Sequence, residues 1–568
     1  MLVNTGLRRA IGAGINKGLS FFAPLKTEIT LARGTGSPTY TRATTAYVED
    51  FEGVWRQVPS GCARFKGARM VRNLLTASQT FTKVGTVTLT TGQDDPIGGT
   101  TAVKVELGGL GISHRVQPSS TPTIAAGLAV SNSIWVRGDV GGEAIKISDG
   151  WIAGDSLSGI TTSWKRFNLS VTSGGSSTPM LYASSGTPTI YVAFAQVQDV
   201  TGASNQAPGE YVSNGVLSAP YHGAGVDGVK YFDTENGNTV ASNVVTEATG
   251  AAIADATLDG YLAEGQRQNR CLYSQDFTNA AWVSGGGGIA VTPNTAVAPD
   301  GTTTADTLTA SGANGTLIQD LGVVASAEKV GGLYLKRKTG TGNIDLTLDG
   351  GATWTTVAVT SSWLLLEKTQ TLADEDFGIR IVTSGDEVYA WQGQVETAAF
   401  ISSVIPTTTA AVTRNTDVLT YPSAGNIAVL SNYSLYAEAQ LNGDTGGNQQ
   451  VIGSDVNYAP YFTFQTGGAS NNLAIFSNTG DASATKALSG GVTGVMRKLA
   501  GSRSTGLSVT ADGATPATNA SNGTETAEAT TINIGVHVGS TQSTFGNIRN
   551  VKIWQRAKTD AQLQALTT

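Results

Sequence analysis

Tryptophans next to glycine and polar residues are the side chains of this sequence best suited to chemistry. Sugar rings stack on flat aromatic faces, so an exposed tryptophan beside Asp, Asn or Gln can hold a glycan. Trp282 and Trp354 have Gly and Thr nearby, which favours exposure, and both are candidate glycan-stacking residues. Trp164 and Trp363 are expected in the core instead. The tryptophans in or beside expected strands are Trp135, Trp151, Trp164, Trp282, Trp354, Trp363, Trp391 and Trp554.

Residues suited to hydrolysis are sparse. His114, His222 and His537 lie far apart in the sequence, which argues against a zinc site or a nucleophile triad. No phosphate-binding GxxxxGK[ST] loop is present. Carboxylates in the runs 374–376 and 386–387 could in principle hydrolyse glycans, but we expect them in solvated loops. The sequence therefore predicts a protein that is not an enzyme, with no catalytic residue and no cofactor.

Two questions of metal and thiol chemistry stay open. Many jelly-roll domains hold a structural calcium ion through Asp and carbonyl oxygens, and Asp300 or Asp512 could contribute, although neither lies in a recognisable ligand loop. Cys62 and Cys271 form no CxxC-type set, which excludes a disulfide framework. Free thiols are expected, and whether these two cysteines interact is left open.

The elements that must position these residues occur twice in the chain. The run Asn269–Phe277 echoes Asn73–Phe81, and Pro299–Ala305 echoes Pro96–Ala102. Several blocks in one order at one spacing indicate a single unit used twice. Three further pairs follow in the same order roughly 200 residues apart: 134–137 with 333–336, 163–164 with 362–363, and 191–198 with 389–396.

Composition favours a chain built from strands. Of 568 residues, only 14% are charged and 71 are glycine, which disfavours long solvated helices and supplies many turns. The net charge of −7 gives no general attraction for nucleic acid or anionic membranes. No run approaches the ~18 apolar residues of a membrane span. The length suggests roughly four compact units.

Period-two alternation and turn signals divide the chain into sandwich-like units. We expect all-β architecture: tandem antiparallel β-sandwiches, with two jelly-roll-like repeats and a different sandwich at the end. Thr559 is a plausible N-cap for a short closing helix. The expected units are an attachment segment with lead-in strands at 1–72, repeat 1 at 73–212, a connector at 213–260, repeat 2 at 261–412 and the last sandwich at 420–568.

The first 26 residues differ from the rest. Apolar residues recur there at roughly helical spacing, interrupted by glycines, which predicts a short helical segment. A signal peptide fits poorly, because Asn16 and Lys17 interrupt the apolar region. Two interpretations remain open: an amphipathic segment packed on its own domain, and a peptide that docks into a larger assembly.

Several motifs resemble those of bacteriophage virion proteins. The run Gly546–Trp554 and the helix after it look like the end of concanavalin A-like (laminin G-like) domains. Repeat 2 resembles a domain common in such virion proteins, whose sandwich is similar to carbohydrate-binding modules of the jelly-roll kind. Tyr40–Ala43 with Arg64-Phe65 matches the usual lead-in. The other matching pieces are Gly260-Tyr-Leu, Glu264, Arg267, Asn269, Ser274, Phe277, Trp282, 299–302 and 405–414.

The resemblance implies a phage structural protein that is tail-associated, a tail fibre or tail-tip protein presenting lectin-like modules to host-surface glycans. The implied partners are other virion proteins at the N-terminal region, a host glycan or receptor, and further copies of the chain, after assembly in the bacterial cytoplasm. Nucleic acid binding and membrane insertion are not expected. The alternatives are a capsid decoration or head fibre protein and a secreted carbohydrate-binding or depolymerising protein.

Overall fold

The computed structural model describes most of the chain between residues 17 and 568. The expected N-terminal helix lies largely outside the described residues, as does most of the predicted connector. Within the expected helical segment, residues 19–23 form a β-strand instead. The described residues are 17–26, 28–70, 73–96, 99–151, 154–203, 206, 208, 211, 221–222, 231–232, 239–240 and 258–568, the last range without 429, 431, 456–460, 467–470, 477–481, 524–526 and 538–542.

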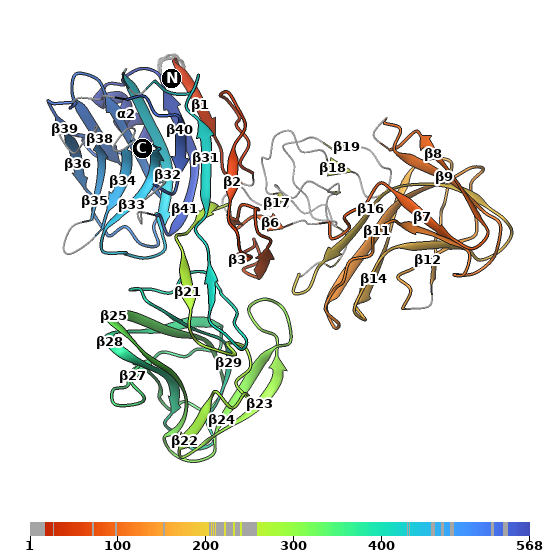
Figure 1. Cartoon of the computed structure of the whole chain (residues 1–568), viewed down its shortest axis with the longest axis horizontal. Helices are drawn as coiled ribbons and strands as arrows, with labels where there is room; N and C mark the ends of the chain where they lie inside the picture. Colours follow the sequence, from red (N-terminus) through yellow and green to blue (C-terminus); the bar gives the residue numbers. More distant parts are fainter. Residues whose placement is uncertain are drawn as a thin grey trace, which may run out of the picture.

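The described part of the chain forms antiparallel β-sheets in three lobes (Figure 1). This confirms the predicted all-β fold class. A short helix, α2 (Asp560–Thr567), closes the chain. The Thr559 hydroxyl accepts a hydrogen bond from the backbone N–H of Gln562 at 3.4 Å, so Thr559 is the N-cap as predicted. No helix in the described ranges has the length and apolar character needed to cross a membrane.

Repeat 1 is a sandwich of two five-stranded sheets around its own core. Its strands are β7 (Phe81–Val84), β8 (Val87–Gln93), β9 (Ala102–Leu107), β10 (Arg115–Pro118), β11 (Ala129–Gly138), β12 (Ile145–Ser148), β13 (Asp155–Ser156), β14 (Lys165–Thr172), β15 (Met180–Ala183) and β16 (Thr189–Asp199). The sheet orders are β13-β12-β15-β10-β7 and β14-β11-β16-β9-β8. In β9, Val103, Val105 and Leu107 are buried while Glu106 is exposed, because successive side chains point to opposite faces.

Repeat 2 has the same arrangement with its two sheets joined. Its strands are β22 (Val283–Gly286), β23 (Ile289–Ala296), β24 (Ala305–Ala310), β25 (Gly315–Thr339), β26 (Ile344–Thr347), β27 (Thr355–Val357), β28 (Leu364–Ile381) and β29 (Glu387–Glu396). The long strands β25 and β28 pair along most of their length and take part in both halves. In repeat 1, two shorter strands, β10 and β11, take the place of β25, and two others, β14 and β15, take the place of β28.

The two repeats make the same hydrogen bonds at the same positions. Asn73 donates from Nδ2 to the carbonyl of Ala195 at 2.9 Å, and its Oδ1 accepts from the N–H of Val197. Asn269 donates to the carbonyl of Gly393 at 3.0 Å, and its Oδ1 accepts from the N–H of Val395. The last strand of each repeat also carries one residue with positive φ: Phe194 at 49° and Gln392 at 55°.

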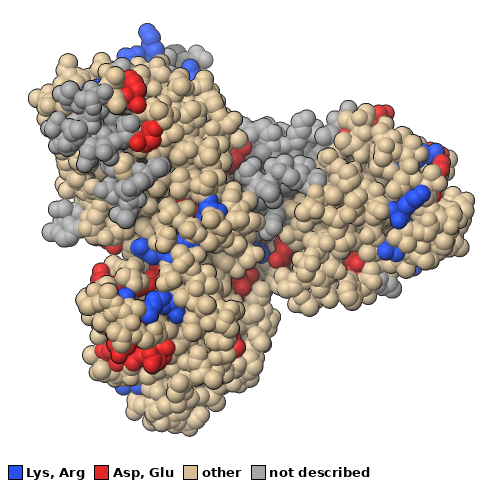
Figure 2. All heavy atoms as spheres, viewed as in Figure 1, with Lys and Arg blue, Asp and Glu red and all other residues tan. Residues whose placement is uncertain are grey.

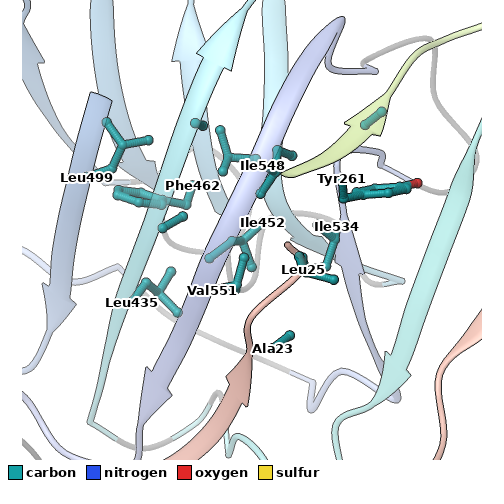
Figure 3. Close-up of a cluster of buried hydrophobic side chains, with 14 of the residues drawn as sticks. Ala23, Leu25, Tyr261, Leu435, Ile452, Phe462, Leu499, Ile534, Ile548 and Val551 are labelled. Carbon is teal, nitrogen blue, oxygen red and sulfur yellow. The ribbon is translucent and has the colours of Figure 1, made fainter. Parts of the chain in front are cut away.

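The lobe at the C-terminus is a larger sandwich of an eight-stranded and a seven-stranded sheet. Its own strands are β31 (Val418–Pro422), β32 (Tyr433–Leu441), β33 (Asn448–Ser454), β34 (Tyr461–Gln465), β35 (Asn472–Phe476), β36 (Ser483–Ala487), β37 (Arg497–Arg503), β38 (Leu507–Ala511), β39 (Ala517–Asn519), β40 (Thr531–Ile534) and β41 (Gly546–Trp554). Side chains of both sheets meet in one core, among them Ile452, Phe462 and Val551 (Figure 3).

Strands from distant parts of the chain complete this C-terminal sandwich. β1 (Leu19–Ala23) and β20 (Gly260–Ala263) both pair with β41, and β5 (Phe65–Lys66) pairs with β20. β2 (Thr39–Thr41) pairs with β31 in the other sheet. The structure differs here from the division expected from the sequence, because the lead-in strands β1, β2 and β5 belong to the same sandwich as residues 420–568.

Both repeats are therefore insertions into one sandwich. The chain leaves for repeat 1 after β5 and returns in β20, its antiparallel neighbour. It leaves for repeat 2 through β21 (Arg267–Asn269) and returns through β30 (Val412–Arg414), which pair with each other. Each repeat begins and ends on adjacent strands, an arrangement that lets a domain be inserted without disturbing its host.

A buried set of charges lies where repeat 2 meets the sandwich, and we call it the joint: Tyr40, Arg42, Arg64, Glu264, Ser403, Arg414 and Asp417. The Asp417 carboxylate accepts hydrogen bonds from Arg42 Nη1 at 2.8 Å and from Arg64. Glu264 pairs with Arg64 at 2.7 Å and with Arg414. These five charged residues of the joint are at most 2% exposed. Lead-in, sandwich and repeat 2 thus share one network.

Ser403 ties repeat 2 into the joint. Its backbone N–H and its hydroxyl both donate to the Glu264 carboxylate, at 2.9 and 2.6 Å. Its hydroxyl oxygen also accepts from Arg64 and Arg414. Buried charges persist only where paired and hydrogen-bonded, so the network fixes the position of these segments relative to one another.

Glu367 in β28 is expected to make the stability of repeat 2 depend on pH. Burial raises the pKa of its carboxyl to about 7; a hydrogen bond from Ile401 opposes this and the charge of Glu396 adds to it. Because the folded pKa exceeds the unfolded one, stability falls as pH rises from about 4.5 to about 7, by about 2 kcal/mol after allowance for solvent screening. Urea unfolding of the Glu367→Gln variant should lose this slope.

The matched control for this prediction is Glu328→Gln, because Glu328 is an exposed glutamate in the paired strand β25. That variant should keep the slope of the unmodified protein between pH 4.5 and 7. An unchanged slope in Glu367→Gln would show that Glu367 is ionised across this range.

Cys62 and Cys271 are both buried, and neither is part of a disulfide. Burial raises the pKa of the Cys271 thiol well above its usual value, which keeps it protonated and unreactive. The two cysteines therefore do not form a disulfide.

Candidate functional site

Trp151 is the most exposed tryptophan ring in the described part of the chain. It follows β12 in repeat 1 and is 61% exposed. Asp149 Oδ1 accepts from its backbone N–H at 3.0 Å, and the indole N–H donates to Ser176 at 3.4 Å. The ring lies against Gly174, where a Cβ would be 3.0 Å from it. The ring is thus held in place with much of its surface open.

Trp354 occupies the corresponding loop of repeat 2, between β26 and β27. The Arg380 guanidinium lies 4.5 Å from the centre of a ring of its indole, in cation–π contact. Arg380 is itself fixed by two hydrogen bonds to Asp345 Oδ2, at 2.8 and 2.6 Å. The side chain of Trp354 is half-buried, so the expected exposure of this residue is found in part.

Hydrogen bonds to Asp349 and Thr347 hold the loop that carries Trp354. Burial raises the pKa of the Asp349 carboxyl, but hydrogen bonds from Thr353, Gln370 and Thr347 outweigh burial and hold that pKa well below its usual range. Thr347 also accepts from the N–H of Gly351 at 2.9 Å, as Ser148 does from Gly150 in repeat 1. Trp151 directly follows Gly150, whereas Gly351, Ala352 and Thr353 stand between Gly350 and Trp354, so the two tryptophans do not align in sequence.

The sheet face beside each tryptophan is polar. In β26, Ile344 and Leu346 belong to the core, so Asp345 between them points to the opposite face. The corresponding face of repeat 1 carries Lys146 and Tyr182, which are paired across β12 and β15. A flat aromatic ring beside hydrogen-bonding side chains can stack on and orient a sugar.

Trp282 does not fit its predicted role. It is 5% exposed and packs against Phe277 at 5.0 Å and Phe377 at 6.4 Å between ring centres. A Cβ on Gly393 would lie 2.9 Å from Cys271 Sγ and 3.2 Å from the indole, so glycine at this position leaves room for both side chains. The glycines that suggested exposure follow Trp282 in a turn, while the ring itself fills the core of repeat 2.

The carboxylates considered for hydrolysis lie in strand β28 (374–376), at the start of β29 (Glu387) and directly before it (Asp386), and of these Asp374 is exposed. Glu375 is fully buried and paired with Arg270 at 2.6 Å and Lys329 at 2.7 Å. Glu387 accepts hydrogen bonds from two threonines, and Asp386 accepts from the N–H of Gly342 at 2.7 Å. Each of these three carboxylates has a structural partner.

One acidic cluster is exposed on repeat 2. Asp320, Asp374 and Asp376 have carboxylate oxygens within 4.8 Å of one another. Figure 2 shows acidic side chains gathered on the lobe that contains repeat 2. Burial and the charges of Asp320 and Asp374 raise the pKa of Asp376. An all-carboxylate donor set suits calcium, whereas Asp300 and Asp512 do not belong to this cluster.

No family model matches the chain, and no curated protein matches it either. Among solved structures, the tandem CBM22-1-CBM22-2 domain of a Paenibacillus barcinonensis protein is 11% identical, covering 58% of this chain and 99% of its own, with a TM-score of 0.18. Domain 4 of an arabinanase from Geobacillus stearothermophilus is 18% identical. The match covers 27% of this chain and 73% of the arabinanase domain, with a TM-score of 0.20. Mouse laminin alpha1 domains LG4-5 are 11% identical. The match covers 44% of this chain and 90% of the laminin chain, with a TM-score of 0.18. These TM-scores are too low to assign a fold or a function to this chain by similarity, so the description of the fold uses only the sheets of this chain.

Proposed function

We propose that the protein is a non-catalytic glycan-binding component of a bacteriophage virion, a tail fibre or tail-tip protein that attaches to the host surface. The observation that carries the glycan-binding part is Trp151, a fixed and largely open aromatic ring, with Trp354 in the same loop of the second repeat. Two such rings on one rigid chain, multiplied by several copies per particle, raise weak binding through effective concentration.

The placement in a virion tail draws on the lead-in motif that the sequence shares with phage proteins. Two residues of that motif, Arg42 and Arg64, meet Glu264 and Arg414, which belong to the motif of repeat 2, in the joint. Their role is to hold repeat 2 on the sandwich, which suits a protein that presents binding modules at a fixed spacing. Immunogold labelling of particles that carry this chain should mark the tail; label on capsid faces would favour the head alternative.

Replacing both rings tests the binding role. We expect the Trp151→Ala, Trp354→Ala double variant of the full chain to bind host envelopes about five- to 150-fold more weakly, because aromatic stacking contributes about 0.5–1.5 kcal/mol at each ring and about 1.4 kcal/mol corresponds to a tenfold change in affinity. Equilibrium binding to isolated envelopes gives the measurement. Trp151→Phe, which keeps a flat ring, should lose less.

The matched control is Val140→Ala, which removes an 81% exposed apolar side chain from the same repeat without touching an aromatic ring. It should bind as the unmodified protein does. Equal envelope binding by the double variant and the control would refute a role for these tryptophans.

A further inference from the structure

A cleft of about 420 Å³ opens where repeat 1, repeat 2 and the lead-in meet. It lies apart from the Trp151 and Trp354 loops, and its lining comes from all three segments. Tyr47, Trp55 and Gln57 come from the lead-in, Asp199 from repeat 1 and Asp300 from repeat 2. Its volume is within the ~300–1,000 Å³ typical of small-molecule sites.

A hairpin holds the cleft together, formed by β3 (Ala46–Glu49) and β4 (Trp55–Val58). Figure 1 places β3 between the lobes. The N–H of Trp55 donates to the carbonyl of Pro299 in repeat 2 at 3.0 Å. The next residue, Arg56, donates to the carbonyl of Thr201 in repeat 1. One short strand therefore contacts both repeats.

The repeats also touch each other directly through glycine. A Cβ on Gly202 would lie 2.6 Å from the Cα of Gly301, and one on Gly301 would lie 2.4 Å from the Cα of Gly202. Both glycines have positive φ, so each is required by its turn as well as by the contact. The backbones of the two repeats meet at van der Waals distance beside the cleft.

Two similar turns each contribute a carboxylate to the cleft. Asp199 Oδ1 accepts from the N–H of Thr201 at 3.0 Å, and Asp300 Oδ1 accepts from the N–H of Thr302 at 2.9 Å. The second oxygen of each carboxylate has no hydrogen-bond donor among the described residues. The charge of Arg56 is matched by Asp50, at 2.8 Å. The net charge facing the cleft is therefore negative.

Aromatic and amide groups complete the lining. Trp55 and Tyr47 are half-buried and pack on the aromatic surface of repeat 2 formed with Tyr334 and Trp391. The exposed Gln57 side chain donates a long hydrogen bond of 3.4 Å to the Tyr47 hydroxyl. Its amide can exchange this hydrogen bond for one to a ligand. Ring surface, acceptor oxygens and an amide together match a polyhydroxylated ring.

We propose that this cleft binds a non-acidic saccharide unit, with amino sugars preferred, and that the ligand bridges the two repeats. The hydroxyl or ammonium groups of the sugar donate to the free oxygens of Asp199 and Asp300, and its apolar face lies on the aromatic wall. Acidic sugars are repelled by the same two carboxylates. The inference rests on the proposed function only for its ligand class, because none of its residues belongs to the tryptophan loops.

Calorimetry on the full chain tests the cleft, with lactose, the β-linked glucosamine dimer and sialyllactose as probes. We expect binding in the order glucosamine dimer, lactose, sialyllactose. Ala125 is exposed on the repeat 1 side of the lining, so Ala125→Trp fills the cleft without removing a core contact. This variant should bind lactose and the glucosamine dimer at least tenfold more weakly, while the matched Ala125→Ser should bind normally.

The charge is tested by the Asp199→Asn, Asp300→Asn double variant. Asparagine keeps the Oδ1 acceptor of each turn, so the loops retain their shape. The preference for the glucosamine dimer over lactose should shrink at least fivefold. Unchanged binding in Ala125→Trp, or no binding of either non-acidic probe by the unmodified chain, overturns the inference. The proposed function is decided separately, by Trp151→Ala, Trp354→Ala on host envelopes.

Discussion

A fragment of residues 418–568, expressed alone, is expected to be insoluble or unfolded, although it contains every strand that the sequence places in the last sandwich. In the full chain, β41 lies inside the eight-stranded sheet, with β32 on one side and β1 and β20 on the other. Without β1 and β20, the whole of β41 becomes an exposed edge, which promotes aggregation.

The core explains the size of the effect. The large side chains of this core that come from outside the fragment include Phe21, Leu25, Phe65, Tyr261 and Leu262. Burying each contributes about 1.5–3 kcal/mol, an upper estimate because unfolded chains are partly compact. Their sum is comparable with the ~5–15 kcal/mol that stabilises an average domain. Losing them leaves the fragment without a net driving force for folding.

The matched comparison is a full chain in which a short Gly-Ser loop replaces residues 69–257. β5 and β20 are antiparallel neighbours, with Lys66 opposite Gly260, so a few residues close the gap. This shortened chain should be soluble and unfold cooperatively by circular dichroism, although it lacks a third of the protein. A monomeric 418–568 fragment with a cooperative transition would contradict the prediction.

The two repeats could be predicted from the sequence because the residues that reveal them make their contacts within their own repeat. Asn73 and Asn269 each satisfy backbone groups of the last strand of their own repeat, and the same residue type is needed at the same place in both copies. Short blocks of sequence therefore preserve the pattern. The pairing of β1 with β41 leaves no recognisable pattern in the sequence, because the alternation of apolar and polar residues in a strand does not specify which strand it pairs with.

The candidate site could be predicted only in part for a similar reason. Trp354 was recognisable from its turn residues, but Trp282 sits before a similar glycine-rich turn and is buried. Trp151 and Trp354 both follow an Asp-Gly pair, but Trp151 does so directly and Trp354 after three further residues, and this different spacing concealed the match. The cleft is made of three segments that are separate in sequence, so no local pattern of residues indicates it.

Replacing Asp417 with Asn is expected to lower the free energy of unfolding of the sandwich and its joint by about 3–5 kcal/mol. The substitution leaves Arg42 and Arg64 buried at no more than 2% exposure, with Glu264 as the remaining carboxylate for Arg64 and Arg414. Breaking a buried pair from one side is costly because an uncompensated charge stays out of water. Urea unfolding followed by tryptophan fluorescence gives the measurement.

The acid limb of the stability curve provides a second, independent readout of the same carboxylate. Burial raises the pKa of Asp417, but Arg64, Arg42 and Arg414 outweigh burial and hold it at about 2. Since the folded pKa lies below the unfolded value of ~3.9, this group stabilises the protein by about 2.5 kcal/mol above pH 4, and that contribution is lost as pH falls towards 2. Asp417→Asn should therefore flatten this part of the curve.

An exposed ion pair provides the control that distinguishes the loss of the buried Asp417 charge from the loss of any one charge. Glu106 pairs with Lys104 at 2.9 Å on repeat 1, and its side chain is 48% exposed. Glu106→Gln should change the free energy of unfolding by no more than about 1 kcal/mol, because water screens exposed pairs. Similar small effects from both substitutions would mean that water reaches the joint. A large loss for Asp417→Asn alone would establish that the lead-in motif orients repeat 2 through buried charge.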